Sequence, residues 1–391
     1  MASNFMASPV VSIEQLLSPF PDVSVTQVRP PYYDAPRQMW YVFSYPAVHR
    51  VLTDHVIFSS DRDRMLPTMP GTDDPLHSSM IGLDPPRHTR LRTLVSYAFT
   101  PRTVARLEPR IHSIVQTLLD QVQGQGTMDV INDVAHPLPS LVIAELLGVP
   151  PEDRDQFRSW SDAYLEFVTP AALQGVHDLT AYFTKLLEQR RQSPRDDLMS
   201  ALLTASIDGE QLSQQEIVGA CMLLLMAGHE TTRNLIGSTV LCLDAFPEAM
   251  ASVVAHPEAI PMALEEVLRY TPPIIMPPPR ITMKESIIDG QLIPAGQWIQ
   301  GWIPAAHRDE DYFPHASVLD IQRTPNRHMG FGYGIHFCLG AALARLEARI
   351  ALEAMLTRLH SLQRVRTVPL ERIESPLLFG LKHLPITFHH V

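Results

Sequence analysis

The stretch Phe331-Gly-Tyr-Gly-Ile-His-Phe-Cys-Leu-Gly-Ala341 carries the most information about the fold of this chain. Glycines at positions 332 and 334 predict a tight turn in which the backbone can approach a flat ligand closely. Apolar residues at helical spacing follow from Leu339 to Ile350, so Cys338 is predicted where a loop becomes a helix. Unpaired backbone N–H groups and the positive dipole end of such a helix favour a thiolate. A thiolate placed in this way can ligate iron.

Other motifs do not fit the same residues. A dinucleotide-binding Gly-x-Gly-x-x-Gly motif would need glycine where Phe337 stands. A nucleophile elbow would need glycine two residues before the nucleophile, where this chain has His336. From this stretch alone, a buried structural cysteine in a glycine-rich turn remains the alternative to a ligand.

A long helix is predicted from the capping box Ser213-Gln-Gln-Glu216 to about Ala245. Its apolar run Met222–Ala227 is interrupted by Gly228-His229-Glu230-Thr231-Thr232. A carboxylate and a hydroxyl in an apolar helix are costly unless they are bonded or used, and glycine costs about 1 kcal/mol relative to alanine. These local departures together indicate a functional site.

Two alternatives apply to this interruption. In the first, the Thr231 hydroxyl bonds back to a helix carbonyl and Glu230 faces solvent. In the second, His229-Glu230 begins the zinc-protease motif His-Glu-x-x-His, but Arg233 stands where the second histidine is required. His229 is therefore interpreted as a polar helix residue rather than a ligand.

Taken together, these motifs resemble those of the cytochromes P450. The cysteine stretch resembles the haem-binding loop of that family, and Ala227-Gly228-His229-Glu230-Thr231 resembles its oxygen-binding helix. Glu266-Val-Leu-Arg269 resembles its Glu-x-x-Arg motif. The resemblance spans about His88 to the C-terminus. It implies a mainly α fold with minor β, a single cytochrome P450-type helical domain with small β-sheets over residues 1–391.

The resemblance also implies a site. The cofactor would be haem b (iron protoporphyrin IX), with Cys338 as the metal ligand. Glu230 and Thr231 would be the catalytic acid–alcohol pair that relays protons, and Gly228 would leave space beside the haem. Because cations should converge on the two haem propionates, the cofactor-binding residues are expected to include His88, Arg92, Arg280 and His336.

The Glu-x-x-Arg motif is expected to be structural. Glu266 and Arg269 lie on one helical turn, and Arg323 is the candidate third member of their triad. Two departures from the family pattern lie nearby. His307 stands where the family usually carries asparagine, and Ser317-Val-Leu-Asp320 lacks the common phenylalanine before the aspartate.

Composition excludes several classes of protein. The 42 acidic against 31 basic residues give a net charge of -11, which argues against nucleic acid as a partner. Three cysteines without a Cys-x-x-Cys pair indicate neither a disulfide framework nor an iron–sulfur cluster, and Cys221 and Cys242 are interpreted as small buried hydrophobes. Residues 1–17 show no signal-peptide pattern, and no 18-residue apolar run is present. We expect a soluble cytoplasmic protein without a membrane anchor.

The periodicity of the chain predicts a series of helices linked by short strands and loops. Strands are expected at Trp40–Phe43, within Arg280–Ile303 and at Leu384–Phe388, and a long loop at Asp61–Leu83. Helices are expected at residues 46–54, 86–99, 103–123, 134–147, 152–167, 171–192, 213–245, 257–270 and 339–360.

The function implied by the resemblance is that of a haem-thiolate monooxygenase. It would insert one oxygen atom from O2, by hydroxylation or epoxidation, into a hydrophobic small molecule or natural-product intermediate. Electrons would come from a separate ferredoxin or flavodoxin with its reductase, and we expect a monomer. The partner is expected to dock near Arg90, Arg102, Arg106 and Arg345. The substrate pocket is expected to draw on residues 62–81, 167–169, 224–227, 274–276 and 377–379.

Two other classes remain open at this point. A haem-binding sensor or carrier would share Cys338 but would have no need for Glu230 and Thr231. A peroxide-driven enzyme would typically replace that acid–alcohol pair.

Overall fold

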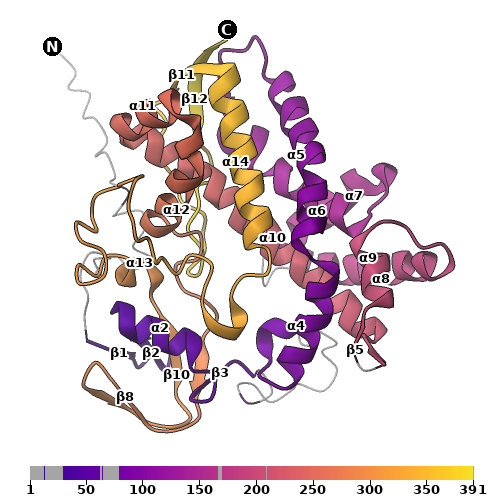
Figure 1. The fold of residues 1–391 in the computed structure, drawn as a ribbon, viewed down its shortest axis with the longest axis vertical. Coiled ribbons are helices and arrows are strands. Elements are labelled where there is room, and N and C mark those ends of the chain that lie inside the picture. The colour runs from indigo at the N-terminus through magenta and orange to yellow at the C-terminus, as the bar shows by residue number, and fades with distance from the viewer. Residues whose placement is uncertain are drawn as a thin grey trace.

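The computed structural model describes residues 30–61, 79–165, 170–207 and 209–390, together with the single positions 13 and 64. It is mainly helical, with small β-sheets beside the helices (Figure 1). The α-helices are α2 (Tyr45–Thr53), α4 (Arg87–Ala98), α5 (Pro101–Gln121), α6 (Pro137–Leu147), α7 (Arg154–Leu165), α8 (Pro170–Gln192), α9 (Leu198–Thr204), α10 (Gln214–Ala245), α11 (Pro247–Ala255), α12 (Ile260–Tyr270), α13 (Ile303–Ala306) and α14 (Ala341–Arg358).

The largest sheet joins distant parts of the chain. It has the strand order β1-β2-β10-β7-β3, in which β2 and β10 are parallel and the other neighbouring pairs are antiparallel. These strands are β1 (Tyr32–Asp34), β2 (Met39–Val42), β3 (Phe58–Ser59), β7 (Arg280–Thr282) and β10 (Trp298–Gly301).

Smaller sheets complete the β portion. β12 (Pro385–His390) lies between β11 (Leu359–Arg364) and β4 (Thr127–Asp129). Two hairpins are formed by β5 (Ser206–Ile207) with β6 (Glu210–Gln211) and by β8 (Ser286–Ile288) with β9 (Gln291–Ile293).

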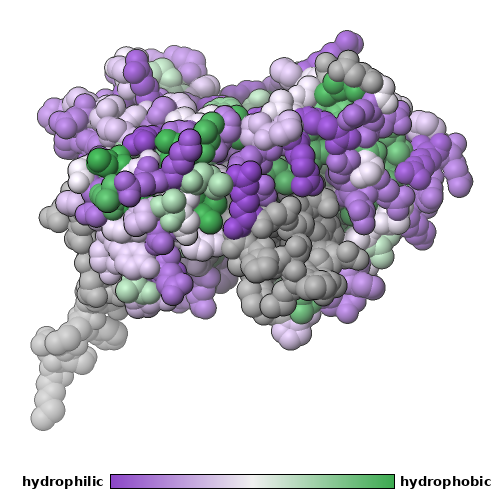
Figure 2. Space-filling view, turned by 90° about the horizontal axis from the view of Figure 1, so that it is seen from below, coloured by the Kyte–Doolittle hydropathy of each residue, from purple (hydrophilic) through white to green (hydrophobic). Residues whose placement is uncertain are grey.

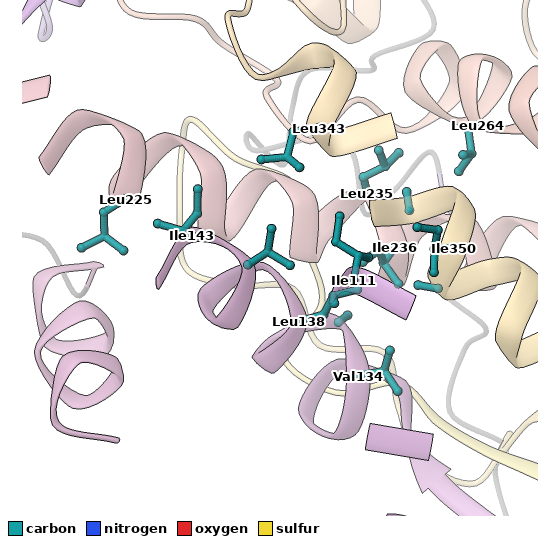
Figure 3. Close-up of a cluster of buried hydrophobic side chains, with 14 of the residues drawn as sticks. Ile111, Val134, Leu138, Ile143, Leu225, Leu235, Ile236, Leu264, Leu343 and Ile350 are labelled. Atoms are coloured by element: carbon teal, nitrogen blue, oxygen red, sulfur yellow. The ribbon is translucent and has the colours of Figure 1, made fainter. Parts of the chain in front are cut away.

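Helix α10 runs through the hydrophobic core. Its start is the predicted capping box, in which the Glu216 N–H donates to Ser213 Oγ and the Ser213 N–H donates to Glu216 Oε2. Apolar side chains of α5, α6, α12 and α14 surround it (Figure 3). The core residues labelled in Figure 3 are Ile111, Val134, Leu138, Ile143, Leu225, Leu235, Ile236, Leu264, Leu343 and Ile350.

On the outside, the face in Figure 2 shows hydrophobic residues in small groups separated by hydrophilic ones.

Each helix predicted within the described residues is present, with its ends shifted by a few residues. The largest shifts, of three residues, are at the starts of α6 and α12. A π-helical turn at Val130–Ala135 precedes α6, and a short 3-10 turn at Pro257–Ala259 precedes α12. Proline has no N–H and is tolerated in the first turn of a helix, which explains the start of α6 at Pro137. Most of the predicted loop 61–83 and all of 167–169 lie outside the described residues.

Several elements were not predicted. Helix α11 follows α10 after a bend of 108°, because Pro247 cannot continue the preceding helix and begins the next one. Helix α9 and strands β4 to β6 are too short to show a clear periodicity. Among the described residues, Val130–Leu147 is long and apolar enough to cross a membrane, and 72% of that segment is buried inside the protein.

The expected triad is present, with Glu266 and Arg269 fully buried and Arg323 partly exposed. Arg269 donates from Nη2 to Glu266 Oε1 at 2.7 Å and from Nε to Oε2 at 2.9 Å. Arg323 Nε lies 3.2 Å from the same Oε1. The Arg269 guanidinium also donates to the carbonyls of His307, Ala316 and Val318. The motif therefore holds the segment that precedes the cysteine stretch.

His307, one departure from the family pattern, strengthens this arrangement. Its Nδ1–H donates to the Arg269 carbonyl at 2.8 Å, and its Nε2 accepts the Met329 N–H at 2.7 Å. Burial holds the pKa of His307 well below its usual value, so the imidazole is neutral and can act as donor and acceptor at once. It links the end of α12 directly to the chain just before Phe331.

We predict that Glu266→Ala lowers the free energy of unfolding by about 3–5 kcal/mol, because it leaves Arg269 as an unpaired buried charge. Chemical denaturation of the purified protein measures this change. The matched control is Glu188→Ala, which removes the exposed i,i+3 pair with Arg191 and should cost less than ~1 kcal/mol. Equal effects of the two substitutions would contradict the structural role of Glu266.

Candidate active site

The cysteine stretch forms the predicted tight turn. Gly332 and Gly334 have φ values of 69° and 68°, a left-handed conformation that favours glycine. A Cβ at Gly334 would lie 3.0 Å from the Leu52 carbonyl oxygen, so this position also needs a residue without a side chain. The Cys338 N–H donates to the Phe331 carbonyl at 2.8 Å and closes the loop.

Cys338 differs from the other two cysteines. Cys221 and Cys242 are buried, as predicted, and burial raises the pKa of each to about 12. Cys338 is partly exposed and lies just ahead of Gly340, the N-cap of α14. This start is two residues later than predicted.

The pKa of Cys338 differs from the expectation that the helix start favours a thiolate. The Gly340 N–H, Arg92 and Arg345 lower the pKa of its thiol, which agrees with the predicted effect of a helix start. Burial outweighs them, however, and the pKa is raised overall. The polypeptide alone therefore does not favour the thiolate, and a metal cation at the sulfur would be needed to stabilise it.

Four predicted cofactor-binding residues gather from three elements. His88 and Arg92 lie on α4, Arg280 on β7 and His336 on the turn before Cys338. The rings of His88 and His336 are 4.4 Å apart. Within the described residues, both ring nitrogens of His88 and Nε2 of His336 are buried without a hydrogen-bond partner.

Few negative charges lie near these four side chains. Burial, then the nearby cations, lower the pKa of His88 to about 4 and of His336 to about 2. Burial alone lowers the pKa of Arg280 to about 10. The nearby carboxylate of Asp84 already accepts hydrogen bonds from Ser59 and Ser60. Buried donors without anions fit the two carboxylates of a haem.

The proposed catalytic pair lies in the middle of α10, where Thr231 is partly exposed and Glu230 is mostly buried. Ala227 is exposed and Thr231 partly exposed, although the helix around them is buried. The Thr231 hydroxyl donates to the Ala227 carbonyl at 2.7 Å, as one of the two alternatives expects. Glu230 does not face solvent. Its side chain is 16% exposed and its Oε1 lies 3.4 Å from Arg233 Nη1.

Arg233 was not predicted to act in the site. The spacing of three residues on one helix face is the signal that could have identified it. Burial raises the pKa of Glu230, and Arg233 and then His136 oppose that shift. Gly228 also differs from expectation. A Cβ there would meet Ile143 Cδ1 at 2.9 Å, so its missing side chain allows α10 to pack against α6.

Three of the four arginines expected at the partner-docking surface are already paired. Arg90 binds Glu210 and Glu216, and Arg106 binds Asp196. Arg345 binds Glu265 at 2.7 Å and lies over the Phe331 ring. Arg345 therefore supports the cysteine loop.

Comparison with known proteins decides the family. The cytochrome P450 family model matches residues 168–389. Cytochrome P450 monooxygenase PikC from Streptomyces venezuelae is 38% identical over 392 residues, covering 99% of this chain and 92% of PikC. This chain belongs to the cytochrome P450 family. Cyclomarin C epoxidase CymV from Salinispora arenicola is also 38% identical, over 90% of this chain and 91% of that protein.

Solved structures agree with the family assignment. Substrate-free CYP109E1 from Bacillus megaterium has a TM-score of 0.89 at 39% identity, covering 93% of this chain and 96% of that structure. Its complex with testosterone has a TM-score of 0.85 at 40% identity, covering 92% and 95%. The mainly α P450 fold is thus confirmed. This P450 is a haem-thiolate monooxygenase, an oxidoreductase with haem b as its cofactor.

The pairing of Glu265 predicts a pH dependence of stability. Burial alone would raise the pKa of Glu265. Hydrogen bonds from Arg345 and His328 nevertheless hold this pKa at about 2, below its usual 4.5. The stabilisation is therefore present above pH 4.5 and is lost as the pH falls towards 2. We predict that Glu265→Gln is less stable than the parent protein near neutral pH, and that this gap narrows as the pH falls below 4.5.

Denaturant unfolding across this pH range measures the gap. In the Glu265→Gln background, Arg345→Met should have a smaller effect than in the parent protein, because only the contact of Arg345 with the Phe331 ring remains to be lost. A gap that does not change with pH would contradict the ion-pair explanation.

Proposed function

We propose that this P450 oxidises a hydrophobic small molecule, such as a steroid or a natural-product intermediate, by hydroxylation or epoxidation. The arrangement of Cys338 beside the cluster of His88, Arg92, Arg280 and His336 carries the proposal, because it combines one sulfur ligand with donors for two carboxylates. The substrate class is supported by relatives named as a cyclomarin C epoxidase and as a protein crystallised with testosterone.

Within this proposal, the bound haem supplies the activation of O2. Cys338 would be its metal ligand, and the Gly340 N–H would donate to the sulfur. Arg92 already donates to the Phe337 carbonyl at 2.6 Å, so it would connect a propionate to the cysteine loop. Arg280 would reach the propionates from β7.

Glu230 and Thr231 would handle protons. The raised pKa of Glu230 keeps a proton on its carboxyl group over a wider pH range than that of an exposed glutamate. Arg233 would orient that carboxyl group. Thr231 donates to Ala227 in this structure, so its hydroxyl oxygen keeps lone pairs that can accept a hydrogen bond from Glu230 or from water. This pair favours O2-dependent oxidation over a haem carrier or a peroxide-driven enzyme.

The expected substrate-binding segments are apolar and partly adjacent. The Ile275 N–H donates to the Leu377 carbonyl at 2.9 Å, and Ile274 pairs with Leu378. A pocket beside α10 is lined mainly by apolar side chains: Met80, Leu91, Val95, Leu212, Leu223 and Leu224, with Ser79, Glu216 and Ala220 completing the lining. The apolar character of segments 274–276 and 377–379 supports a hydrophobic substrate.

Electrons would come from a separate ferredoxin or flavodoxin with its reductase. Of the four arginines considered for docking, Arg102 is exposed and has no ion-pair partner in the described part of the chain. It is the best candidate for contact with an acidic partner. We further propose that residues 1–391 form a single domain that acts as a monomer in the cytoplasm. The large hydrophobic cluster, which includes residues from Ile13 to Phe388, supports one domain.

The carbon monoxide difference spectrum of the reduced protein tests the assignment of Cys338. We predict a strongly red-shifted Soret band for the parent protein and its loss in Cys338→Ala, because the sulfur would no longer bind the metal. Cys221→Ala is the matched control, since Cys221 is buried in the core and should leave the band unchanged. The same band in Cys338→Ala would overturn the assignment.

The proton-relay role is tested by the coupling of electron use to product. We predict that Thr231→Ala lowers the ratio of product formed to NAD(P)H consumed several-fold and raises peroxide release. Thr239→Ala is the matched control, because its hydroxyl makes the same bond, to the Leu235 carbonyl at 2.7 Å, further along α10. Unchanged coupling in Thr231→Ala would contradict the relay.

A further inference from the structure

Three potential metal ligands meet where three helices pack together. His136 is the residue just before α6, Asp162 lies on α7, and His229 lies on α10 one residue before Glu230. One ligand atom from each lies within 4.8 Å of the others. His136 Nε2 is 3.3 Å from Asp162 Oδ1, and the two imidazole rings are 4.8 Å apart.

One ligand atom in this cluster has no partner. Among the described residues, His229 Nδ1 is buried without a hydrogen-bond partner. Asp162 Oδ1 faces His136 Nε2, and the neighbouring cation, Arg158, faces the other carboxylate oxygen, Oδ2, at 4.0 Å. An unpaired buried acceptor is costly, so His229 Nδ1 requires a partner that accepts its lone pair.

The backbone prepares His229 for this role. Its Nε2 is 3.2 Å from the carbonyl oxygen of His136. A carbonyl can only accept, so Nε2 carries the proton and Nδ1 keeps its lone pair. A ring N–H that donates to a backbone carbonyl is the arrangement that orients histidine ligands in metal sites.

We propose that His136, Asp162 and His229 form a site for a divalent transition-metal ion such as Zn²⁺, separate from the haem iron. Two imidazoles and one carboxylate are a donor set that Zn²⁺ binds, with water as a fourth ligand. Bonds of about 2.0–2.2 Å place neighbouring ligand atoms ~3.3 Å apart around a tetrahedral ion. The His136–Asp162 pair already has this separation.

Asp162 has a side chain that is 41% exposed, so a small rotation can bring its carboxylate towards His229. An ion held there would tie α10 to α6 and α7 beside Gly228. It would also place positive charge next to Glu230, the proposed proton donor.

Calorimetric titration of the haem-loaded, tag-free protein with Zn²⁺ tests the site. We expect one saturable ion per chain, and affinity at least tenfold weaker in His136→Gln and in Asp162→Asn. The matched control is His177→Gln, which alters an exposed histidine–aspartate pair whose Nδ1 lies 3.2 Å from Asp178, and should leave the affinity unchanged. Anomalous diffraction at the zinc edge would locate the ion.

Absence of saturable binding, or equal affinity in all variants, would overturn the proposal. The carbon monoxide spectrum recorded on the same samples reports haem ligation separately, so failure of the zinc site and failure of the proposed function can be distinguished. Retention of that spectrum in His136→Gln and Asp162→Asn would also show that these variants remain folded.

Discussion

The rest of the structure depends on the buried charge of Arg269. An isolated guanidinium in the core would be strongly destabilising, so every contact that compensates it is also a positional constraint. The Glu266 carboxylate takes two of its N–H groups, and the remaining donors reach three backbone carbonyls between His307 and Val318. The chain leading to the cysteine loop is thereby fixed relative to α12.

The same set of contacts extends from Arg269 to Cys338, the proposed metal ligand. His307 joins the end of α12 to Met329. Arg345, held by Glu265 on α12, lies over the Phe331 ring at the base of the loop. Cys338 closes that loop through its N–H bond to Phe331. The sulfur is therefore positioned by a rigid frame of side chains, which is the preorganisation that a metal ligand requires.

The charges around Cys338, His88 and His336 indicate which kind of cofactor the site can bind. The Cys338 thiol has a raised pKa, so it needs a cation to become a thiolate. His88 and His336 have lowered pKa values and no anionic partner within hydrogen-bond reach in the described chain. A group that carries a metal cation at its centre and two carboxylates at its edge satisfies both requirements. Haem b has that distribution of charge.

The sequence by itself determined the features that depend on local rules. The capping box at Ser213, the glycine turn at residues 332 and 334 and the helix periodicities follow from spacing alone, and all were found in the structure. The motifs around Cys338, Glu230 and Glu266 identified the family because each stands in a short continuous stretch. The triad with Arg323 was also correctly anticipated.

Only the tertiary structure decided the properties that depend on burial and on distant neighbours. The raised pKa of Cys338 results from desolvation, which no sequence pattern reports. Gly228 packs on Ile143, and Arg345 is neutralised by Glu265, because helices separated by many residues meet there. The His136, Asp162 and His229 cluster likewise comes from three helices. Such contacts are set by the packing of the whole core, and the sequence of one segment does not contain them.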